Sequence, residues 1–201
     1  MIIKCGAHQA TARRSTLDMQ GSTDGMNFHR TAIASHRGGA FLWPENGLTA
    51  FRATARLALD QAECDVHASA DGEAIIIHDA TLERTTDGIG RVVARTSRDL
   101  AALRLRGGAG ETVPRLAEML DVFHGSPVAP RIEIKEDADG RPYPGLVGRV
   151  LSDLDRSGLR GRSWIIGFDA PTMAEVAAAG GLAGVEHVFA VDVAHARSAD
   201  R

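Results

Sequence analysis

The stretch QAECDVH, residues 61–67, decides how the rest of the chain is interpreted. Side chains alternate between the two faces of a β-strand, so Glu63 and Asp65 share one face, while the cysteine and valine next to them share the other. His67 falls on the acidic face, where it has either a structural role or a supporting role beside the carboxylates. Strands covered by helices on both faces are ordinarily apolar throughout, and buried carboxylates need compensating partners. The stretch therefore predicts a buried strand with a charged site on one face.

The segment RIEIK, residues 131–135, repeats this pattern, with Glu133 and Lys135 on one face and two isoleucines on the other. Together with the first strand it offers three carboxylates, which one shared divalent cation would satisfy; structural salt bridges are the alternative. Oxygen ligands without a soft ligand favour Mg²⁺ or Ca²⁺ over zinc. Because the cation leaves one negative charge uncompensated, Arg37 and Lys135 are expected to balance that charge and the charge of a phosphate diester.

Two histidines stand where predicted strands end, His36 in IASHRGG and His78 in IIIHD. The unperturbed pKa of histidine is ~6.5, so a pair can hold one protonated and one neutral ring at neutral pH. Displacement at phosphorus needs such a pair, with one base for the attacking oxygen and one acid for the leaving alcohol. A purely structural role is the alternative for each. The remaining histidines have no supporting residues around them: His8, His29, His124, His187 and His195.

Short β-type runs alternate with segments of helical periodicity from residue 31 onward, which is typical of an α/β fold with a parallel sheet. Strands are predicted at 31–35, 61–67, 74–78, 130–135, 163–168 and 186–192. Helices are predicted after the N-cap candidate Asn46 as far as Leu59, from Pro114 to Gly125, over 145–157, and from Pro171 to Gly180.

Two segments depart from this alternation. Residues 70–73, ADGE, leave no room for a crossover helix between the second and third strands. They form either a hairpin or a helix-free return of the chain to the floor of a barrel. Residues 79–113 are a long interruption after the third strand, which predicts a small insertion or lid.

Composition limits the classes of protein to consider. The chain has 201 residues, 44% of them hydrophobic, which predicts one globular domain over 28–201 behind a disordered leader over 1–27. The net charge of −3 argues against nucleic-acid binding. The sequence contains no run of about 18 apolar residues, so a membrane span is not expected. The two cysteines, Cys5 and Cys64, lack metal-ligand spacing and indicate a reducing compartment, so we expect the cytoplasm.

Over residues 28–170 the chain resembles the glycerophosphodiester phosphodiesterase family, through the ordered motifs HRGG, WPENGLTAF, ECDVHASADGEAIIIHDATLERTTDG, VPRLAEML and RIEIK. The resemblance implies a TIM-type (β/α) barrel that uses one divalent cation, Mg²⁺ or Ca²⁺. It also implies a small-molecule glycerophosphodiester substrate, hydrolysed to glycerol 3-phosphate and an alcohol.

Matched position by position, the motifs imply specific roles for residues of this chain. Within PEN, Glu45 is expected to support Arg37, and Asn46 to cap the following helix. The resemblance implies that His36 and His78 are the acid/base pair. It implies that Glu63, Asp65 and Glu133 are the metal ligands. It also implies that Arg37 and Lys135 contact the substrate phosphate.

The length of the chain disagrees with a complete barrel. A (β/α)₈ barrel takes about 250 residues, whereas six predicted strands precede the polar end of this sequence, so we expect an incomplete barrel without its last units. Three explanations are open: a truncated product, a homo-oligomer in which a partner copy supplies the missing wall, or a sixth strand that closes a smaller sheet. Two functional alternatives remain beside the implied activity. One is a phosphodiesterase for lysophospholipids or phosphoinositides, and the other is a catalytically impaired fragment that only binds phosphate ligands or a partner chain.

Overall fold

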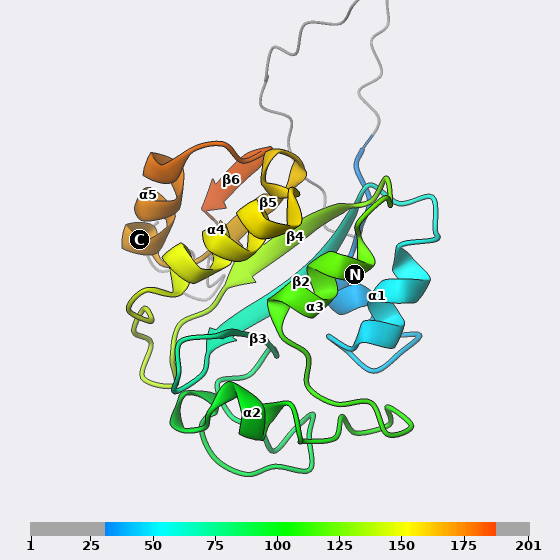
Figure 1. The fold of residues 1–201 in the computed structure, drawn as a ribbon, viewed down its shortest axis with the longest axis vertical. Helices are drawn as coiled ribbons and strands as arrows, with labels where there is room; N and C mark the ends of the chain where they lie inside the picture. The colour runs from blue at the N-terminus through cyan, green and yellow to red at the C-terminus, as the bar shows by residue number, and fades with distance from the viewer. Residues whose placement is uncertain (1–30, 188–201) are drawn as a thin grey trace, which may run out of the picture.

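The structure of the protein is a computed structural model that describes residues 31–187, drawn in Figure 1. The predicted leader, residues 1–27, lies outside the described residues, as do residues 188–192 of the predicted sixth strand. Within the described residues, every helix falls short of the length and apolar character that a membrane crossing requires.

Five strands form a parallel sheet, which confirms the predicted α/β fold class. Neighbouring strands pair in the order β1-β2-β4-β5-β6. Within residues 31–187, β1 and β6 are the two edges and do not pair with each other, so the described sheet is open there. The five strands are β1 (Ala34–Ser35), β2 (Gln61–Ala68), β4 (Ala129–Ile134), β5 (Trp164–Gly167) and β6 (Gly184–His187).

The short strand β3 (Ala74–Ile76) pairs antiparallel with β2, with Val66 opposite Ile76. The ADGE segment is therefore a hairpin turn, and of its two interpretations the return to the barrel floor is wrong. Gly72 takes a left-handed backbone conformation in this turn, with φ +78°, which glycine adopts without steric cost.

Four α-helices pack on one side of the sheet (Figure 1). The residues predicted to face inward from the second of these helices, Leu116, Met119, Leu120 and Phe123, are all fully buried. The helices are α1 (Leu48–Thr54), α3 (Leu116–Val122), α4 (Leu146–Ser157) and α5 (Ala170–Ala179); short 3₁₀ turns occur at His36–Gly38 and Arg160–Arg162.

The first helix corrects two predictions. It ends at Thr54, so Leu59 lies outside it. Its N-cap is Gly47 and not Asn46. Asn46 has a left-handed backbone with φ +60°, whereas an N-cap residue takes an extended conformation, as Gly47 does here.

The main core lies between these helices and the outward-facing side chains of the strands. Cys64 and Val66 of β2 and Ile132 and Ile134 of β4 all belong to it, as alternation along the two strands predicts. Phe51 of α1 and Phe123 meet edge to face within this core, with ring centroids 6.2 Å apart. The opposite faces of β2 and β4 are therefore free to carry polar groups.

The insertion, residues 79–113, forms its own small unit beneath the sheet in Figure 1. It contains a 3₁₀ turn at Val92–Ala94 and the helix α2 (Ser97–Leu100). The Thr86 hydroxyl donates to Leu82 O at 2.7 Å and accepts from Gly88 N at 3.0 Å, so this part of the RTTDG motif shapes the turn. A second apolar cluster holds the insertion to β3: Ile75, Ile77, Leu82, Val92, Leu100, Leu105 and Val113.

Candidate functional site

Three carboxylates gather on the inner face of two adjacent parallel strands. Glu63 and Asp65 come from β2, Glu133 comes from β4, and the register of the pair sets Asp65 opposite Glu133. One oxygen from each of the three residues lies within 4.8 Å of the others. All three side chains are buried, Asp65 completely. The sequence prediction that these residues share one face of the sheet is confirmed.

Burial and like charge oppose ionisation of this cluster. Burial, reinforced by the charge of Asp65, raises the pKa of Glu63 to about 8. Burial also raises the pKa of Glu133 against the pull of the Lys135 ammonium. Burial alone would raise the pKa of Asp65 as well, but Lys135 and a hydrogen bond from Asn46 outweigh it, so the pKa of Asp65 lies below its ordinary value.

The two predicted phosphate contacts both lie at the carboxylate cluster. Lys135 Nζ is 3.0 Å from Asp65 Oδ1 and forms a second, very short ion pair with Glu133 Oε1. Arg37 Nε is 3.5 Å from Asp65 Oδ2, and the Arg37 backbone N–H donates to Glu63 Oε2 at 2.7 Å. Both cationic side chains thus lie within 3.5 Å of the Asp65 carboxylate.

A strained turn directs Arg37 toward the cluster. Arg37 has φ +51°, a left-handed conformation that is uncommon for a residue with a side chain. Gly38 follows with φ +71°, and a Cβ atom there would meet Ala50 Cβ at 3.0 Å, so the turn packs closely against α1. The glycines of HRGG therefore let the chain reverse direction directly after β1, and the reversal brings the backbone N–H of Arg37 to Glu63.

The donor set fits a hard divalent cation. Among the described residues, Glu63 Oε1 is buried and has no hydrogen-bond partner, although its sister oxygen is bonded. An unsatisfied buried carboxylate oxygen is costly unless a cation or a donor reaches it. Three carboxylates at this spacing supply the oxygen ligands that Mg²⁺ and Ca²⁺ prefer. These residues could therefore hold the predicted ion.

The two predicted acid/base histidines lie at the same end of the sheet. His36 directly follows β1, and burial together with the neighbouring Arg37 lowers its pKa. His78 follows β3, and its Nδ1 lies 2.6 Å from Asp79 Oδ1. His78 also lines a cavity of about 300 Å³ together with Glu133 and Lys135. The structure thus brings this histidine to the cavity that the carboxylate cluster borders.

His67 lies on the same inner face of β2 as Glu63 and Asp65 and supports the backbone at His78. Its ring is buried between two hydrogen-bond partners, Tyr143 Oη at 2.8 Å from Nδ1 and the His78 carbonyl oxygen at 3.0 Å from Nε2. Burial lowers the pKa of His67 to about 4, so the ring is neutral at neutral pH. His67 therefore connects the structural core to the backbone at His78.

Around the carboxylates, one contact was expected from the sequence and several others were not. Asn46, expected to cap a helix, instead donates from Nδ2 to Asp65 Oδ2 at 2.8 Å. Glu45 was expected to support Arg37, and its Oε1 does accept from Arg37 Nη1 at 3.1 Å. Asp79 and Arg84 were not singled out, although the motif HDATLER contains both. Asp79 contacts His78 and Arg84 within this motif, whereas Arg84 also contacts Glu45, which lies outside it.

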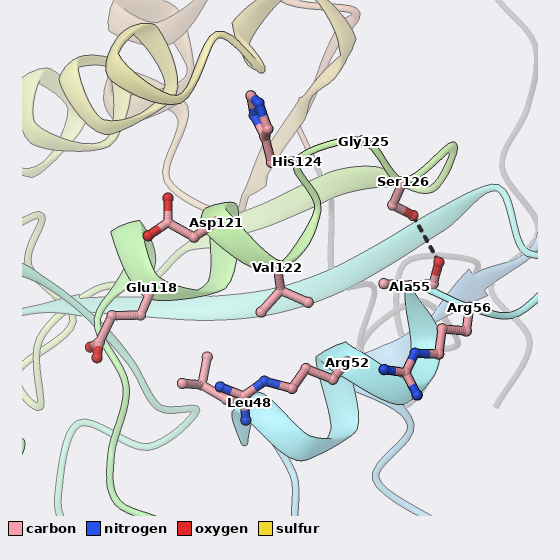
Figure 2. A pocket seen from close by; sticks show the side chains of 10 residues that line it. All are labelled: Leu48, Arg52, Ala55, Arg56, Glu118, Asp121, Val122, His124, Gly125 and Ser126. Carbon is pink, nitrogen blue, oxygen red and sulfur yellow. Dashed lines mark hydrogen bonds between the residues drawn. The ribbon is translucent and has the colours of Figure 1, made fainter.

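A separate cavity of about 660 Å³ lies between α1 and α3, as Figure 2 shows. Ser126 Oγ closes one end by donating to the Ala55 carbonyl oxygen at 2.9 Å. Arg52 and Arg56 line one wall, and Asp121 lies on α3 opposite them. His124 is exposed there. None of the seven residues predicted for the site lines this cavity, so it is distinct from the carboxylate cluster.

Comparison with known proteins shows which family this chain resembles. The sequence model of the glycerophosphoryl diester phosphodiesterase family matches residues 36–180. A glycerophosphodiester phosphodiesterase of Caldanaerobacter subterraneus is 30% identical over 152 residues, which are 73% of this chain and 62% of that protein. One from Bacillus subtilis is 29% identical over 146 residues, 66% of this chain and 48% of that protein.

Solved structures agree in fold. A glycerophosphodiester phosphodiesterase from Agrobacterium tumefaciens superposes with a TM-score of 0.64 at 29% identity, over 75% of this chain and 64% of that one. A phosphodiesterase from Oleispira antarctica, solved with its product sn-glycerol-3-phosphate, shares the fold with a TM-score of 0.66 at 24% identity, over 84% and 70% of the two chains. This chain spans less than two thirds of either curated relative. Its match to the family model covers most of its own length, and the chain belongs to the glycerophosphoryl diester phosphodiesterase family.

Proposed function

We propose that this protein is a metal-dependent phosphodiesterase that hydrolyses glycerophosphodiesters to glycerol 3-phosphate and an alcohol. One observation carries the proposal: three buried carboxylates from β2 and β4 meet within 4.8 Å beside two cationic side chains. Such a cluster is unfavourable in isolation and becomes favourable once a divalent cation and an anionic substrate share it.

In this proposal Glu63, Asp65 and Glu133 hold Mg²⁺ or Ca²⁺. When bound there, the cation supplies charge that polarises the phosphoryl oxygens of the substrate. Lys135 and Arg37 bind the free phosphate oxygens, because both cations already lie within 3.5 Å of Asp65 at the edge of the cluster. Their charge also stabilises the additional negative charge that develops as the phosphorus centre is attacked.

The two histidines move protons in this scheme. His36 has a lowered pKa, so its ring is neutral at neutral pH and able to accept a proton from the attacking oxygen. The Asp79 carboxylate occupies Nδ1 of His78, which leaves Nε2 as the atom that exchanges a proton with the leaving alcohol. The cavity of about 300 Å³ beside His78 extends to Ala80 and Phe168 and gives room for the part of the substrate beyond the phosphate.

The full 201-residue chain, assayed with glycerophosphocholine, tests the proposal. We expect release of glycerol 3-phosphate in the presence of Mg²⁺ or Ca²⁺, loss of activity with EDTA, and recovery when the cation is returned. His36→Ala should abolish hydrolysis without changing the melting temperature. Hydrolysis that persists in EDTA would remove the cation from the proposal, and an active His36→Ala variant would remove the histidine.

The same assay separates the alternatives. A panel that includes a lysophospholipid and a phosphoinositide identifies the preferred diester. A chain that melts cooperatively and binds phosphate but hydrolyses no diester would be a binding protein in place of an enzyme. A cytoplasmic location is part of the proposal and rests on the sparse cysteines of the sequence. Light scattering of the same sample establishes whether copies of the chain associate.

A further inference from the structure

Arg84 is a side chain near the start of the insertion that the proposed mechanism does not use. Its guanidinium group contacts two carboxylates from different parts of the chain. Arg84 Nε donates to Asp79 Oδ2 at 2.5 Å, and Nη2 donates to Asp79 Oδ1 at 2.9 Å. The same group donates to Glu45, with Nη1 at 3.0 Å from Oε2 and Nη2 at 2.7 Å from Oε1. The planar fork of arginine suits such double pairing, whereas lysine offers only a point charge.

Each of these two carboxylates holds a residue of the proposed site. Asp79 Oδ1, which accepts from Arg84, is also the oxygen 2.6 Å from His78 Nδ1. Glu45 Oε1, which accepts from Arg84, also accepts from Arg37 Nη1 at 3.1 Å. One guanidinium group therefore lies one carboxylate away from a histidine and one carboxylate away from a phosphate-binding arginine.

The donors of Arg84 are largely used by these contacts. Four of its hydrogen bonds go to Asp79 and Glu45, so the group is occupied by protein carboxylates and not directed at a substrate. The hydrogen bond from Arg84 is also the main cause of a strongly lowered pKa of Asp79, which keeps that carboxylate ionised beside His78. Both observations suit a residue that acts through its neighbours.

We infer that Arg84 is a positioning residue, which holds the Asp79–His78 pair and the Glu45–Arg37 pair in register and so couples the insertion to the site on the sheet. This inference rests on the proposed function for its effect on activity, but its effect on His78 is independent of it. Removing the partners that orient metal ligands typically lowers metal affinity or activity by about 10- to 100-fold, and we expect the same range for the partners of His78 and Arg37.

The test compares Arg84→Ala with a matched control, Arg91→Ala. Arg91 is also an insertion arginine with a double contact, to Asp139 at 2.9 and 3.2 Å, but neither residue of that pair is among those that line the cavity beside His78. We expect Arg84→Ala to lower kcat for glycerophosphocholine by about 10- to 100-fold. The control should stay within about twofold of the unmodified chain, because exposed ion pairs contribute little.

A measurement without turnover tests the positioning directly. In ¹⁵N-labelled protein with Mg²⁺, the Nδ1–H proton of His78, assigned by its loss in His78→Gln, should give a resolved signal in the unmodified chain and in Arg91→Ala. The signal should disappear by exchange with water in Arg84→Ala. Arg84→Lys keeps the charge and most of the side chain, so it serves if the alanine variant fails to fold; we expect it to lose the signal as well.

The outcomes are distinguishable. If the unmodified chain hydrolyses no diester but the His78 signal depends on Arg84, the proposed function fails and the positioning role stands. If the chain is active and Arg84→Ala matches Arg91→Ala in both rate and signal, the positioning role is wrong and the proposed function stands. An Arg84→Lys variant with the full signal and full rate would show that charge alone suffices and would overturn the role of the guanidinium fork.

Discussion

The parallel sheet and the insertion treat charge in opposite ways. On the sheet, Glu63 and Asp65 are 1% and 0% exposed, and the groups that neutralise them are side chains of the same small cluster. In the insertion, Arg84 and Arg91 have side chains 46% and 50% exposed, and the carboxylates that pair with them are only partly buried. Both regions bury an apolar cluster, but within residues 31–187 the cluster of buried carboxylates lies on the sheet and not in the insertion.

The difference shows how the work of the site is divided. Parallel strands fix their side chains through continuous backbone pairing. For this reason β2 and β4 can hold like-charged side chains close together more rigidly than a loop could. The insertion supplies contacts to residues beside the cluster, from Asp79 to His78 and from Arg84 to Glu45. The sheet therefore places the carboxylates that are proposed to hold the cation, and the insertion contacts the residues beside them.

The largest effect should come from removing the charge of one buried carboxylate. Glu63→Gln should lower activity by more than about 100-fold, because losing a ligand costs more than losing one of its partners. At pH 7 the same change should stabilise EDTA-treated protein by about 1–4 kcal/mol, because the folded pKa of about 8 lies above the unfolded value of about 4.3 and folding then requires this carboxyl to take up a proton. Thermal melts with EDTA and with added Mg²⁺ measure the second effect. Glu175→Gln, an exposed carboxylate on α5, is the control, and a Glu63→Gln variant no more stable than it would contradict the interpretation.

Deleting an apolar side chain from each core compares the two regions directly. Phe123→Ala should destabilise the whole domain by about 3–5 kcal/mol, because Phe123 is fully buried in the main core. Leu100→Ala should cost about 2–5 kcal/mol but act locally, because Leu100 belongs to the smaller cluster. Hydrogen exchange followed by mass spectrometry should show loss of protection across β2 and β4 for the first variant and over 79–113 for the second. Loss of protection over β4 in Leu100→Ala would mean that the two cores unfold as one.

A smaller effect is expected where the insertion contacts the first helix. Glu111 Oε1 accepts from Thr49 N at 2.6 Å, so a residue of the insertion satisfies a free N–H group in the first turn of α1. Glu111→Ala should cost about 0.5–2 kcal/mol, the usual range for a lost helix cap. Urea denaturation measures the loss, with Glu175→Ala as the exposed control. Equal midpoints for the two variants would show that the contact does not stabilise the helix.

The smallest effect should be a pH dependence of stability where the turn between β2 and β3 contacts helix α2 of the insertion. Asp71, in the turn between β2 and β3, accepts from the Ser69 and Ser97 hydroxyls at 2.6 and 2.7 Å, which lowers its pKa to about 2. A lowered pKa in the folded state stabilises the fold above the unfolded pKa of about 3.9, and this stabilisation is lost as the pH falls toward 2. The melting temperature of Asp71→Asn should therefore lie below that of the unmodified chain at pH 5 and approach it at pH 3. A constant difference between these pH values would contradict the assignment.

The faces of the strands could be predicted from sequence because alternation is a local property. The prediction that Glu63, Asp65 and Glu133 share one face required only their positions within two short apolar runs. The register of β2 with β4 then brings the three residues together. Their common burial followed from the same pattern, because the residues between them belong to the core.

Contacts between distant segments could not be predicted in this way. Arg84 and Glu45 are separated by 39 residues, and their contact depends on how the insertion folds back over the turn after β1. Asn46 was expected to cap a helix because its sequence position allowed it. Its left-handed backbone and its bond to Asp65 became visible only with the turn in place. Local signals name the residues that carry charge, but tertiary structure decides which of them meet.

Alternation along β2 also constrains how this gene can change. Gln61, Glu63, Asp65 and His67 line the polar face, and every residue between them is buried in the main core. Losing or gaining one codon near the start of this strand would exchange the two faces for the residues after it, turning the Cys64 thiol toward the polar face and the carboxylates toward the apolar core. A neighbouring residue can compensate for a single substitution, but no single neighbour can compensate for an insertion or deletion that reverses the alternation of the strand. Length variation among relatives should therefore collect in the loops, such as 79–113, and spare this strand.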